Sequence, residues 1–253
     1  MTVKELYDRM AEQLPEELRE SWDNDGLMCS PDLNAPVRRV LVALDVTEEI
    51  VDYALENGFD LIVSHHPLIF RPITHLEPSN PVARKLIELV GGGVSVFSFH
   101  TRADKAEGGV NDLLAEIMEL HNIEPFGEGG LGRIGEFAED MSLEDFAYLL
   151  KGQLDSPTVL VADGYNRVRR VAVVGGDGKS YIPAAIAAGA DTFVSGRISY
   201  NTMEEAAELG INLLEAGHYF TENPVVERFS QMLSRIDSSL VVQTLESNVI
   251  KAI

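Results

Sequence analysis

The segment Asp-Leu-Ile-Val-Ser-His-His-Pro-Leu-Ile-Phe, residues 60–70, decides the fold, because a short apolar strand runs directly into two adjacent histidines and a proline. Residues 61–63 form the continuous apolar run that is typical of a strand covered on both faces. Pro67 cannot donate a hydrogen bond to a neighbouring strand, so we expect the strand to end before it. His65 and His66 then lie where the backbone leaves the sheet and can turn both imidazoles toward one point. Open α/β sheets bind ligands at such strand ends, although an isolated pair also fits one buried structural histidine beside an exposed one.

The composition is that of a globular protein, because 45% of the 253 residues are hydrophobic and 24% are charged. The single cysteine, Cys29, excludes a disulfide framework and suits a reducing compartment, so we expect a cytoplasmic protein. Residues 1–15 carry apolar side chains at helical spacing, and Thr2 and Glu5 form the pattern of a capping box. This predicts an amphipathic helix and not a signal peptide. No apolar run is long enough to span a bilayer, so we expect no membrane partner.

The net charge of −21 at pH 7 repels polyanions over the whole surface. Any nucleic-acid binding would have to be local, through metal ions or a few arginines. The charge therefore favours a small-molecule substrate over a nucleic acid.

Two halves of the chain share one order of predicted elements. In the first half, strands over residues 40–44, 61–63 and 94–99 alternate with helices over 48–57 and 82–90. In the second half, Arg169-Arg170-Val171 matches Arg38-Arg39-Val40, and Gly189-Ala190-Asp191 matches Gly58-Phe59-Asp60, without a gap. This duplication predicts an α/β fold of two related, intertwined lobes with mixed sheets, over residues 1–125 and 126–253. The glycine-rich segment 123–135 is the expected boundary.

Five side chains of metal-ligand type fall at the ends of matching strands: His65, His66, Asp104, His218 and Glu222. Three imidazoles and two carboxylates suit divalent zinc, iron, manganese, cobalt or nickel, and do not suit calcium. One ion would need only three or four of these ligands. Because a carboxylate can bridge two ions, the set fits a two-metal centre.

Of the remaining histidines, only His100 is a candidate for the functional site. The repeat aligns His100 with His218, and since the first lobe already supplies two histidines, His100 is a candidate acid or base, or a hydrogen-bond donor beside the ligands. His75 in a proline-rich loop and His121 near a helix end are expected to be solvated surface residues.

Two turn-rich segments have open interpretations. Residues 21–27 predict a turn that contains a core tryptophan, Trp22. The segment Gly175-Gly176-Asp177-Gly178-Lys179-Ser180 lies between a strand and a helix, and it is either a phosphate cradle or a tight turn. Its glycine spacing does not match a Walker motif.

The chain resembles the Nif-three-like family, also labelled the GTP cyclohydrolase I type 2 homologues, which includes the bacterial YbgI-type proteins. The motifs appear in the family's order, nearly end to end: Trp-Asp-Asn-x-Gly-Leu at 22–27, Ser-His-His-Pro-Leu-Ile-Phe at 64–70, His-Thr-x-x-Asp at 100–104, Gly-Gly-Val-Asn-Asp at 108–112, and Gly-His-Tyr-x-Thr-Glu at 217–222. The resemblance implies two similar lobes with a dinuclear metal centre between them, held by the same five ligands. It also implies a homo-oligomer, a toroidal hexamer.

From the predicted metal centre together with the resemblance we expect a metal-dependent hydrolase of a small nucleotide-like or phosphorylated substrate. The position of His100 in the repeat makes it the expected catalytic residue. The alternatives are a two-metal phosphoesterase or nuclease, and a non-catalytic metal-binding scaffold or adaptor in the form of a ring.

The chain departs from its family after the second-lobe strand. The family usually reads Gly-Asp-x-x-x-His there, whereas this chain has Arg197 in place of the carboxylate and Asn201 in place of the imidazole. We expect Arg197 either to pair with Asp104 or Glu222, to bind a phosphate of the substrate, or to turn out to solvent.

Overall fold

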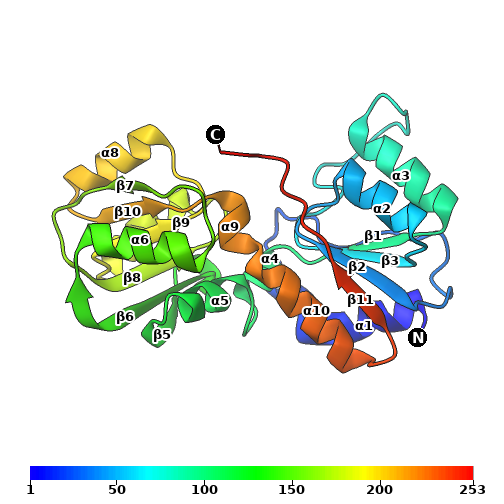
Figure 1. The fold of residues 1–253 in the computed structure, drawn as a ribbon, viewed down its shortest axis with the longest axis horizontal. Helices are drawn as coiled ribbons and strands as arrows, with labels where there is room; N and C mark the ends of the chain where they lie inside the picture. The colour runs from blue at the N-terminus through cyan, green and yellow to red at the C-terminus, as the bar shows by residue number, and fades with distance from the viewer. Residues whose placement is uncertain (253) are drawn as a thin grey trace. The chain divides into compact units, whose positions relative to one another are not determined.

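The protein is described here by a computed structural model that covers residues 1–252, and the chain divides into two compact units (Figure 1). Unit 1 consists of Met1–Ala106 and Val225–Ile250, and unit 2 consists of Glu107–Pro224 with Lys251 and Ala252. These units do not coincide with the expected lobes over residues 1–125 and 126–253. The difference arises because the chain returns to unit 1 after Pro224, where it adds a helix and an edge strand.

Unit 1 is built on a five-stranded mixed sheet of order β1-β4-β3-β2-β11. The strands are β1 (Gly26–Cys29), β2 (Arg39–Ala43), β3 (Leu61–Ser64), β4 (Ser95–Ser98) and β11 (Val241–Thr244). The helices are α1 (Val3–Gln13), η1 (Glu16–Leu18), α2 (Glu48–Glu56), α3 (Pro81–Gly92), α4 (Thr101–Lys105) and α10 (Pro224–Ile236). Only β1 runs antiparallel to its neighbour, at one edge of the sheet.

Local sequence signals explain where these helices begin and end. The predicted capping box of α1 is confirmed: the Glu5 backbone N–H donates to the Thr2 hydroxyl, and the Glu5 carboxylate accepts from the Thr2 N–H. Asn80 caps α3 ahead of a proline in its first turn, and Gly93 ends that helix in the left-handed conformation, with φ of 81°.

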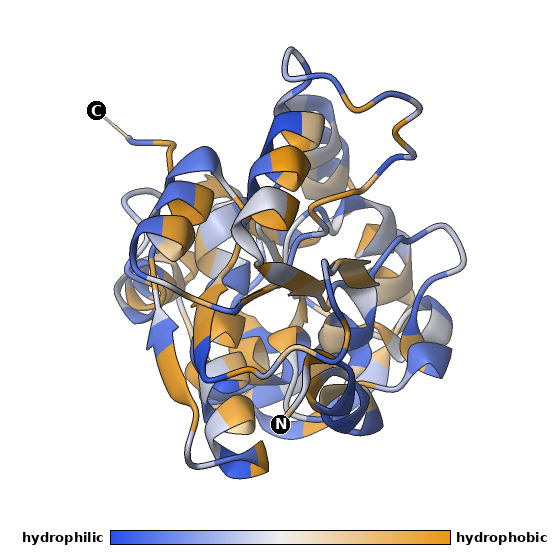
Figure 2. Cartoon of the chain, turned by 90° about the vertical axis from the view of Figure 1, so that its right-hand side faces the viewer, coloured by the Kyte–Doolittle hydropathy of each residue, from blue (hydrophilic) through white to orange (hydrophobic). Residues whose placement is uncertain are grey.

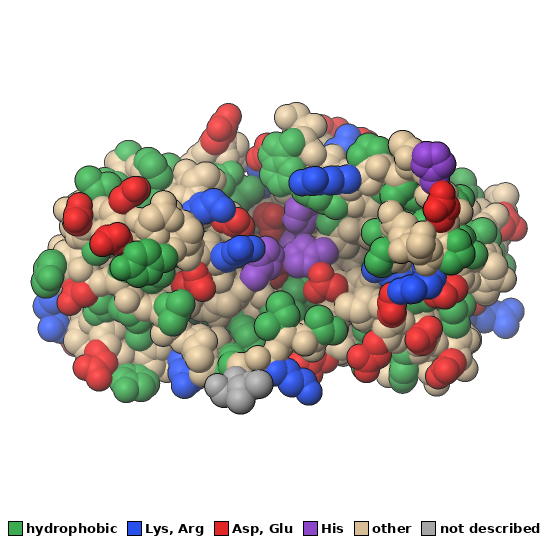
Figure 3. All heavy atoms as spheres, turned by 90° about the horizontal axis from the view of Figure 1, so that it is seen from above, with side chains coloured by type: hydrophobic (Ala, Val, Ile, Leu, Met, Phe, Trp, Pro, Cys, Tyr) green, Lys and Arg blue, Asp and Glu red, His purple; other side chains and the backbone are tan. Residues whose placement is uncertain are grey.

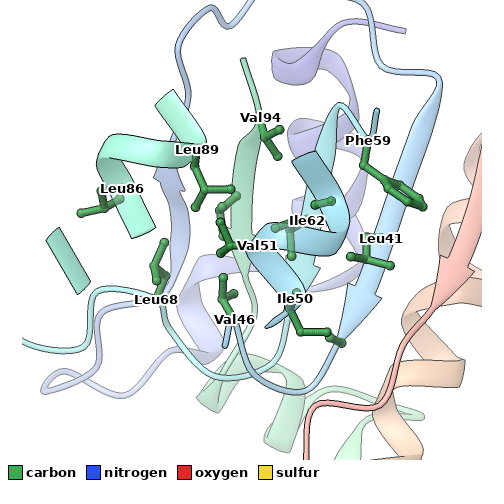
Figure 4. Close-up of a cluster of buried hydrophobic side chains, with 13 residues drawn as sticks. Leu41, Val46, Ile50, Val51, Phe59, Ile62, Leu68, Leu86, Leu89 and Val94 are labelled. Atoms are coloured by element: carbon green, nitrogen blue, oxygen red, sulfur yellow. The ribbon is translucent and has the colours of Figure 1, made fainter. Parts of the chain in front are cut away.

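The sheet of unit 1 is covered on both faces. Leu41 and Ile62 pack with Ile50 and Val51 of α2 and with Leu89 of α3 in one buried cluster (Figure 4). Ring contacts mark the other face, where Tyr7 of α1 meets Phe97 at 5.2 Å between centroids and Phe229 of α10 meets Phe99 at 6.2 Å. All four residues of β3 are buried, which agrees with the apolar run from which a doubly covered strand was predicted.

Unit 2 is built on a six-stranded mixed sheet of order β5-β6-β8-β9-β10-β7. The strands are β5 (His121–Phe126), β6 (Gly132–Met141), β7 (Leu160–Ala162), β8 (Val168–Val174), β9 (Thr192–Ser195) and β10 (Asn212–Glu215). The helices are α5 (Val110–Ile117), η2 (Glu128–Gly130), α6 (Leu143–Gln153), η3 (Lys179–Tyr181), α7 (Ile182–Ala187), α8 (Tyr200–Glu208) and α9 (His218–Glu222). The predicted α/β class with two mixed sheets is confirmed.

The glycine-rich segment 123–135, expected to be a domain boundary, lies inside unit 2. It forms the end of β5, the turn η2 and the start of β6, and the two strands pair antiparallel. Gly127, Gly129 and Gly130 all have positive φ, so the glycines serve the geometry of a turn and not that of a linker.

The predicted duplication is visible in the hydrogen bonds of each unit. The Asp60 carboxylate accepts from the backbone N–H groups of Arg38 and Arg39, and the Asp191 carboxylate accepts from those of Arg169 and Arg170. In both units three parallel strands follow in the same order, β2-β3-β4 in unit 1 and β8-β9-β10 in unit 2.

The backbone also corrects one alignment. The N–H of Ser95 donates to Asp60 and that of Asn212 donates to Asp191, so Ser95 and Asn212 are equivalent. Counting onward, Thr101 at the start of α4, and not His100, is equivalent to His218 at the start of α9. The sequence alignment was one residue out because it matched residue types, whereas the strands are registered by backbone hydrogen bonds.

Hydropathy and charge follow the expected surface pattern. In Figure 2 the helices alternate hydrophobic and hydrophilic residues along their length, as amphipathic helices do. Acidic side chains are scattered over the face shown in Figure 3, in keeping with the net charge of −21. Over residues 1–252, none of the helices combines the length and the apolar character that crossing a bilayer requires.

Candidate metal centre

Two histidines follow β3 directly, where the strand leaves the sheet of unit 1. The N–H of His66 donates to the Leu44 carbonyl at 3.0 Å, and the Ser64 hydroxyl donates to the His66 carbonyl at 2.9 Å. These bonds bend the chain, and the two imidazole rings lie with their centroids 5.1 Å apart. The expected convergence of both rings at one strand end is therefore present.

Each of these rings is oriented through its Nδ1 atom. Nδ1 of His65, whose side chain is fully buried, lies 3.0 Å from the Phe99 carbonyl. Nδ1 of His66 lies 2.7 Å from a carboxylate oxygen of Asp45. Both partners only accept hydrogen bonds, so Nδ1 carries the proton and Nε2 of the neutral ring is the atom that can bind a metal.

His100 joins the pair from the end of β4. Its ring centroid lies 5.2 Å from that of His65 and 5.7 Å from that of His66. Its Nδ1 donates to the Asp23 carboxylate at 2.8 Å, so the third ring is held in the same way as the first two. One ligand atom from each of the three histidines lies within 4.8 Å of the others, which is close enough for a shared ion.

Asp104 lies on the single turn of α4 that follows His100. One of its carboxylate oxygens is 3.6 Å from Nε2 of His65. The helix is held by Arg102, whose buried guanidinium binds the Asp25 carboxylate and the Leu14 carbonyl. Unit 1 thus collects three imidazoles and one carboxylate, a donor set that fits a borderline divalent ion such as zinc or iron.

The electrostatics of His100 and Asp23 are coupled. Burial opposes protonation of His100, but the hydrogen bond to Asp23 and the charges of Asp104 and Asp23 outweigh it and raise the pKa of His100. For Asp23, burial alone would raise the pKa, because it disfavours the charged carboxylate. The hydrogen bonds from His100 and Thr101 and the charge on His100 outweigh this effect and lower the pKa of Asp23 to about 2. His100 therefore retains its proton to a higher pH than a free histidine does.

Unit 2 brings the other two predicted ligands together on α9. Nε2 of His218 lies 3.0 Å from a carboxylate oxygen of Glu222, one helical turn away. The space around them is made by glycine: a Cβ atom on Gly176 would lie 2.1 Å from Oε1 of Glu222, and one on Gly196 would lie 2.7 Å from Cα of His218. The Gly175–Ser180 segment is thus a tight turn that packs against predicted ligands.

The residues expected at the surface are found there. His75 and His121 are exposed. Arg197 and Asn201 are exposed as well, and within the described part of the chain the Arg197 guanidinium makes no ion pair. The backbone N–H of Arg197 donates to the Gly176 carbonyl at 2.8 Å. Within unit 2, the pairing of Arg197 with Glu222 is therefore not found.

Sequence reasoning missed the partners of the histidines. Asp45 follows β2, the strand next to β3. Its carboxylate at a neighbouring strand end could have been recognised in the sequence as a partner for His66. Asp23 lies in the turn-rich segment between Trp22 and Asn24, distant in sequence from His100, and only the fold brings the two together.

Three comparisons place these features among known proteins. The family model for Duf34/NIF3 (NGG1p interacting factor 3) matches residues 1–252. A Clostridium perfringens protein named GTP cyclohydrolase 1 type 2 homolog is 32% identical over 248 residues, which covers 95% of this chain and 94% of that protein. The crystal structure of Staphylococcus aureus protein SA1388 matches with a TM-score of 0.90 at 28% identity and covers 100% of this chain and 99% of that one. Reduced HcgD from Methanocaldococcus jannaschii matches with a TM-score of 0.86 at 30% identity, over 97% and 98% of the two chains.

Proposed function

The chain belongs to the Duf34/NIF3 family, and from this we propose that it is a metal-dependent hydrolase of a small nucleotide-like or phosphorylated substrate. The observation that carries the proposal is the convergence of His65, His66 and His100, each with Nδ1 facing a hydrogen-bond acceptor. Relatives named GTP cyclohydrolase 1 type 2 homolog support a nucleotide-like substrate.

We propose that the chain binds two divalent transition-metal ions through His65, His66, Asp104, His218 and Glu222. Support in unit 1 comes from the clustered imidazoles and Asp104, and support in unit 2 comes from the adjacent His218 and Glu222. The joining of both sets in one centre is implied by the sequence resemblance. The donor chemistry suits zinc, iron, manganese, cobalt or nickel.

The chemistry divides between the ions and the protein. A bound divalent ion would supply Lewis acidity, which polarises the substrate and activates water for attack. His100 would move the proton: Asp23 holds its Nδ1–H, so Nε2 is the atom that donates or accepts during hydrolysis.

The test is turnover by the purified, metal-loaded chain on a panel of nucleotides and phosphoesters. We expect hydrolysis by the wild-type chain and by the His75→Ala control, and none by the double variant His65→Ala, Glu222→Ala. Activity that survives in the double variant would come from a contaminant. Stoichiometric metal binding without turnover on any substrate would instead favour the non-catalytic scaffold.

We further propose that the chain assembles as a toroidal homohexamer, which the sequence resemblance implies. A charge of −21 per chain opposes close association, so we expect the assembly to loosen at low salt, where the charges are less screened. Light scattering over a range of salt concentrations tests this. A monomer at every salt concentration would contradict the ring.

A further inference from the structure

Two large aromatic side chains, Trp22 and Phe70, lie exposed in unit 1. Trp22 is 62% exposed and Phe70 is 47% exposed. Their ring centroids are 6.3 Å apart and the ring planes meet at 70°. Tryptophan is on average a highly buried residue, and the expectation of a core tryptophan is wrong for Trp22. The pair therefore has a role other than core packing.

Trp22 is exposed on a loop that hydrogen bonds of its neighbours hold in place. The neighbouring Asp23 side chain is buried and accepts hydrogen bonds from the backbone N–H of Thr101 at 3.1 Å and from its hydroxyl at 2.6 Å. The Asn24 side-chain amide donates to the Ile69 carbonyl, which ties this loop to the residue before Phe70. Rings held in advance lose little conformational entropy when a ligand binds.

The aromatic pair borders the histidine cluster directly. The Trp22 ring lies 6.2 Å from the His100 ring, with an interplanar angle of 78°. The Phe70 ring lies 6.1 Å from the same imidazole, at 87°. A flat ring stacked on Trp22 would thus bring its substituents to the group that we propose as the proton carrier.

We propose that Trp22 and Phe70 form a subsite for a planar aromatic heterocycle, the base of a nucleoside. The inference rests on the proposed function and narrows it, because a phosphorylated sugar without a base would not use this subsite. Bases stack on aromatic side chains without any particular hydrogen-bond pattern, and an exposed indole ring beside a phenyl ring inclined to it at 70° suits that mode. The other occupant that would cover two exposed rings is a second copy of the chain, and the experiment separates the two.

Trp22 is the only tryptophan of the chain, so its fluorescence reports on the subsite directly. We would titrate guanosine and adenosine into the full chain, metal-free and zinc-loaded, with ribose 5-phosphate as the ring-free control. The nucleosides should quench Trp22 emission in a saturable way, and ribose 5-phosphate should not. In calorimetry, Trp22→Leu should weaken nucleoside binding ~10-fold or more, while Trp22→Phe keeps most of it. Tyr165→Leu, which removes a ring that is 91% exposed in unit 2, is the matched control and should change nothing.

Several outcomes would overturn the subsite. One is the lack of saturable quenching in zinc-loaded protein, and another is unchanged nucleoside affinity in Trp22→Leu. Emission that depends on protein concentration, with a smaller particle for Trp22→Leu in light scattering, would assign the rings to a second copy. Failure to bind zinc would count against the proposed function alone, because the metal-free titration still tests the subsite.

Discussion

The carboxylate of Asp23 holds the imidazole of His100 through a hydrogen bond of 2.8 Å from Nδ1. Its second oxygen accepts from the Thr101 hydroxyl and backbone N–H, so the carboxylate cannot rotate away. The contact therefore sets both the orientation and the tautomer of the ring. Asp45 does the same for His66 at 2.7 Å.

Replacing Asp23 by asparagine should weaken metal binding ~10-fold or more, because the His100 ring, which packs against the rings of the proposed ligands His65 and His66, loses the charged partner that orients it. The pKa of His100 should fall as well, since the carboxylate charge is one of the causes that raise it. Metal titration and histidine proton NMR of the metal-free chain measure the two effects. Asp32→Asn, at an exposed carboxylate that caps a turn, is the control. Equal metal affinity in the Asp23→Asn and Asp32→Asn variants would show that Asp23 has no such role.

Gly176→Ala should destabilise the protein more than Gly189→Ala. Both glycines have positive φ, at 62° and 79°, so both alanines pay a similar backbone cost of ~1 kcal/mol. Only at Gly176 would the new Cβ collide with Glu222, whereas nothing lies within 4 Å at Gly189. We expect a further loss of ~1–2 kcal/mol in the free energy of unfolding, measured by urea denaturation. Equal losses would mean that the Glu222 side chain moves aside freely.

Elemental analysis of the purified, metal-replete chain should find about two transition-metal ions per chain, because five ligands exceed the three or four that one ion needs. His65→Ala should lower this content, and His75→Ala, at an exposed loop histidine, should not. A content well below one ion per wild-type chain would exclude the dinuclear centre.

Arg197→Ala should leave the metal content unchanged, because the guanidinium is exposed and makes no ion pair among residues 1–252. If Arg197 binds a phosphate of the substrate, KM for a phosphorylated substrate should rise ~10-fold, which is the loss of one charge-assisted hydrogen bond. Arg169→Ala, at another exposed arginine of unit 2, is the control. Unchanged kinetics would place Arg197 among the solvent-facing arginines.

Cys29 should react slowly with iodoacetamide in the native protein. Burial raises the pKa of its thiol to about 11 from an ordinary value of 9.0, although a backbone hydrogen bond involving Val96 lowers it. At pH 8 the native thiolate fraction is then ~100-fold smaller than in the unfolded chain, and alkylation should slow in proportion. A native rate equal to the rate in urea would contradict the burial of the thiol.

The raised pKa of Cys29 also makes the free energy of unfolding depend on pH. Between pH 9 and 11 the folded state keeps a proton that the unfolded state has lost. The free energy of unfolding should therefore decrease as the pH rises through this window, and it should decrease less in Cys29→Ala. Urea denaturation at pH 8 and pH 10 of both chains measures the difference.

The α/β class, the duplication and the clustering of His65 with His66 could be predicted from sequence, because they depend on local signals: an apolar run, a proline, and a repeated Gly-x-Asp. The partner of His100 could not, since Asp23 reaches it only through the packing of a loop against α4. The one-residue error in matching His100 to His218 has a similar cause, because register is set by backbone bonds that side-chain identities do not encode. The glycine-rich segment 123–135 was expected to be a domain boundary but forms a turn inside unit 2, because glycine occurs in tight turns as often as in linkers.

Unit 1 is interrupted by unit 2 and is finished only when α10 and β11 arrive, with β11 pairing against β2. On the ribosome, the continuous stretch Glu107–Pro224 can therefore emerge whole and fold while β2 still has an open edge. An unpaired strand edge is a site for mispairing between nascent chains. β11 then takes the place of β2 at the edge of the sheet, and its residues are exposed or half-buried, whereas four of the five residues of β2 are buried. The nascent protein is therefore most exposed to aggregation before β11 has been synthesised.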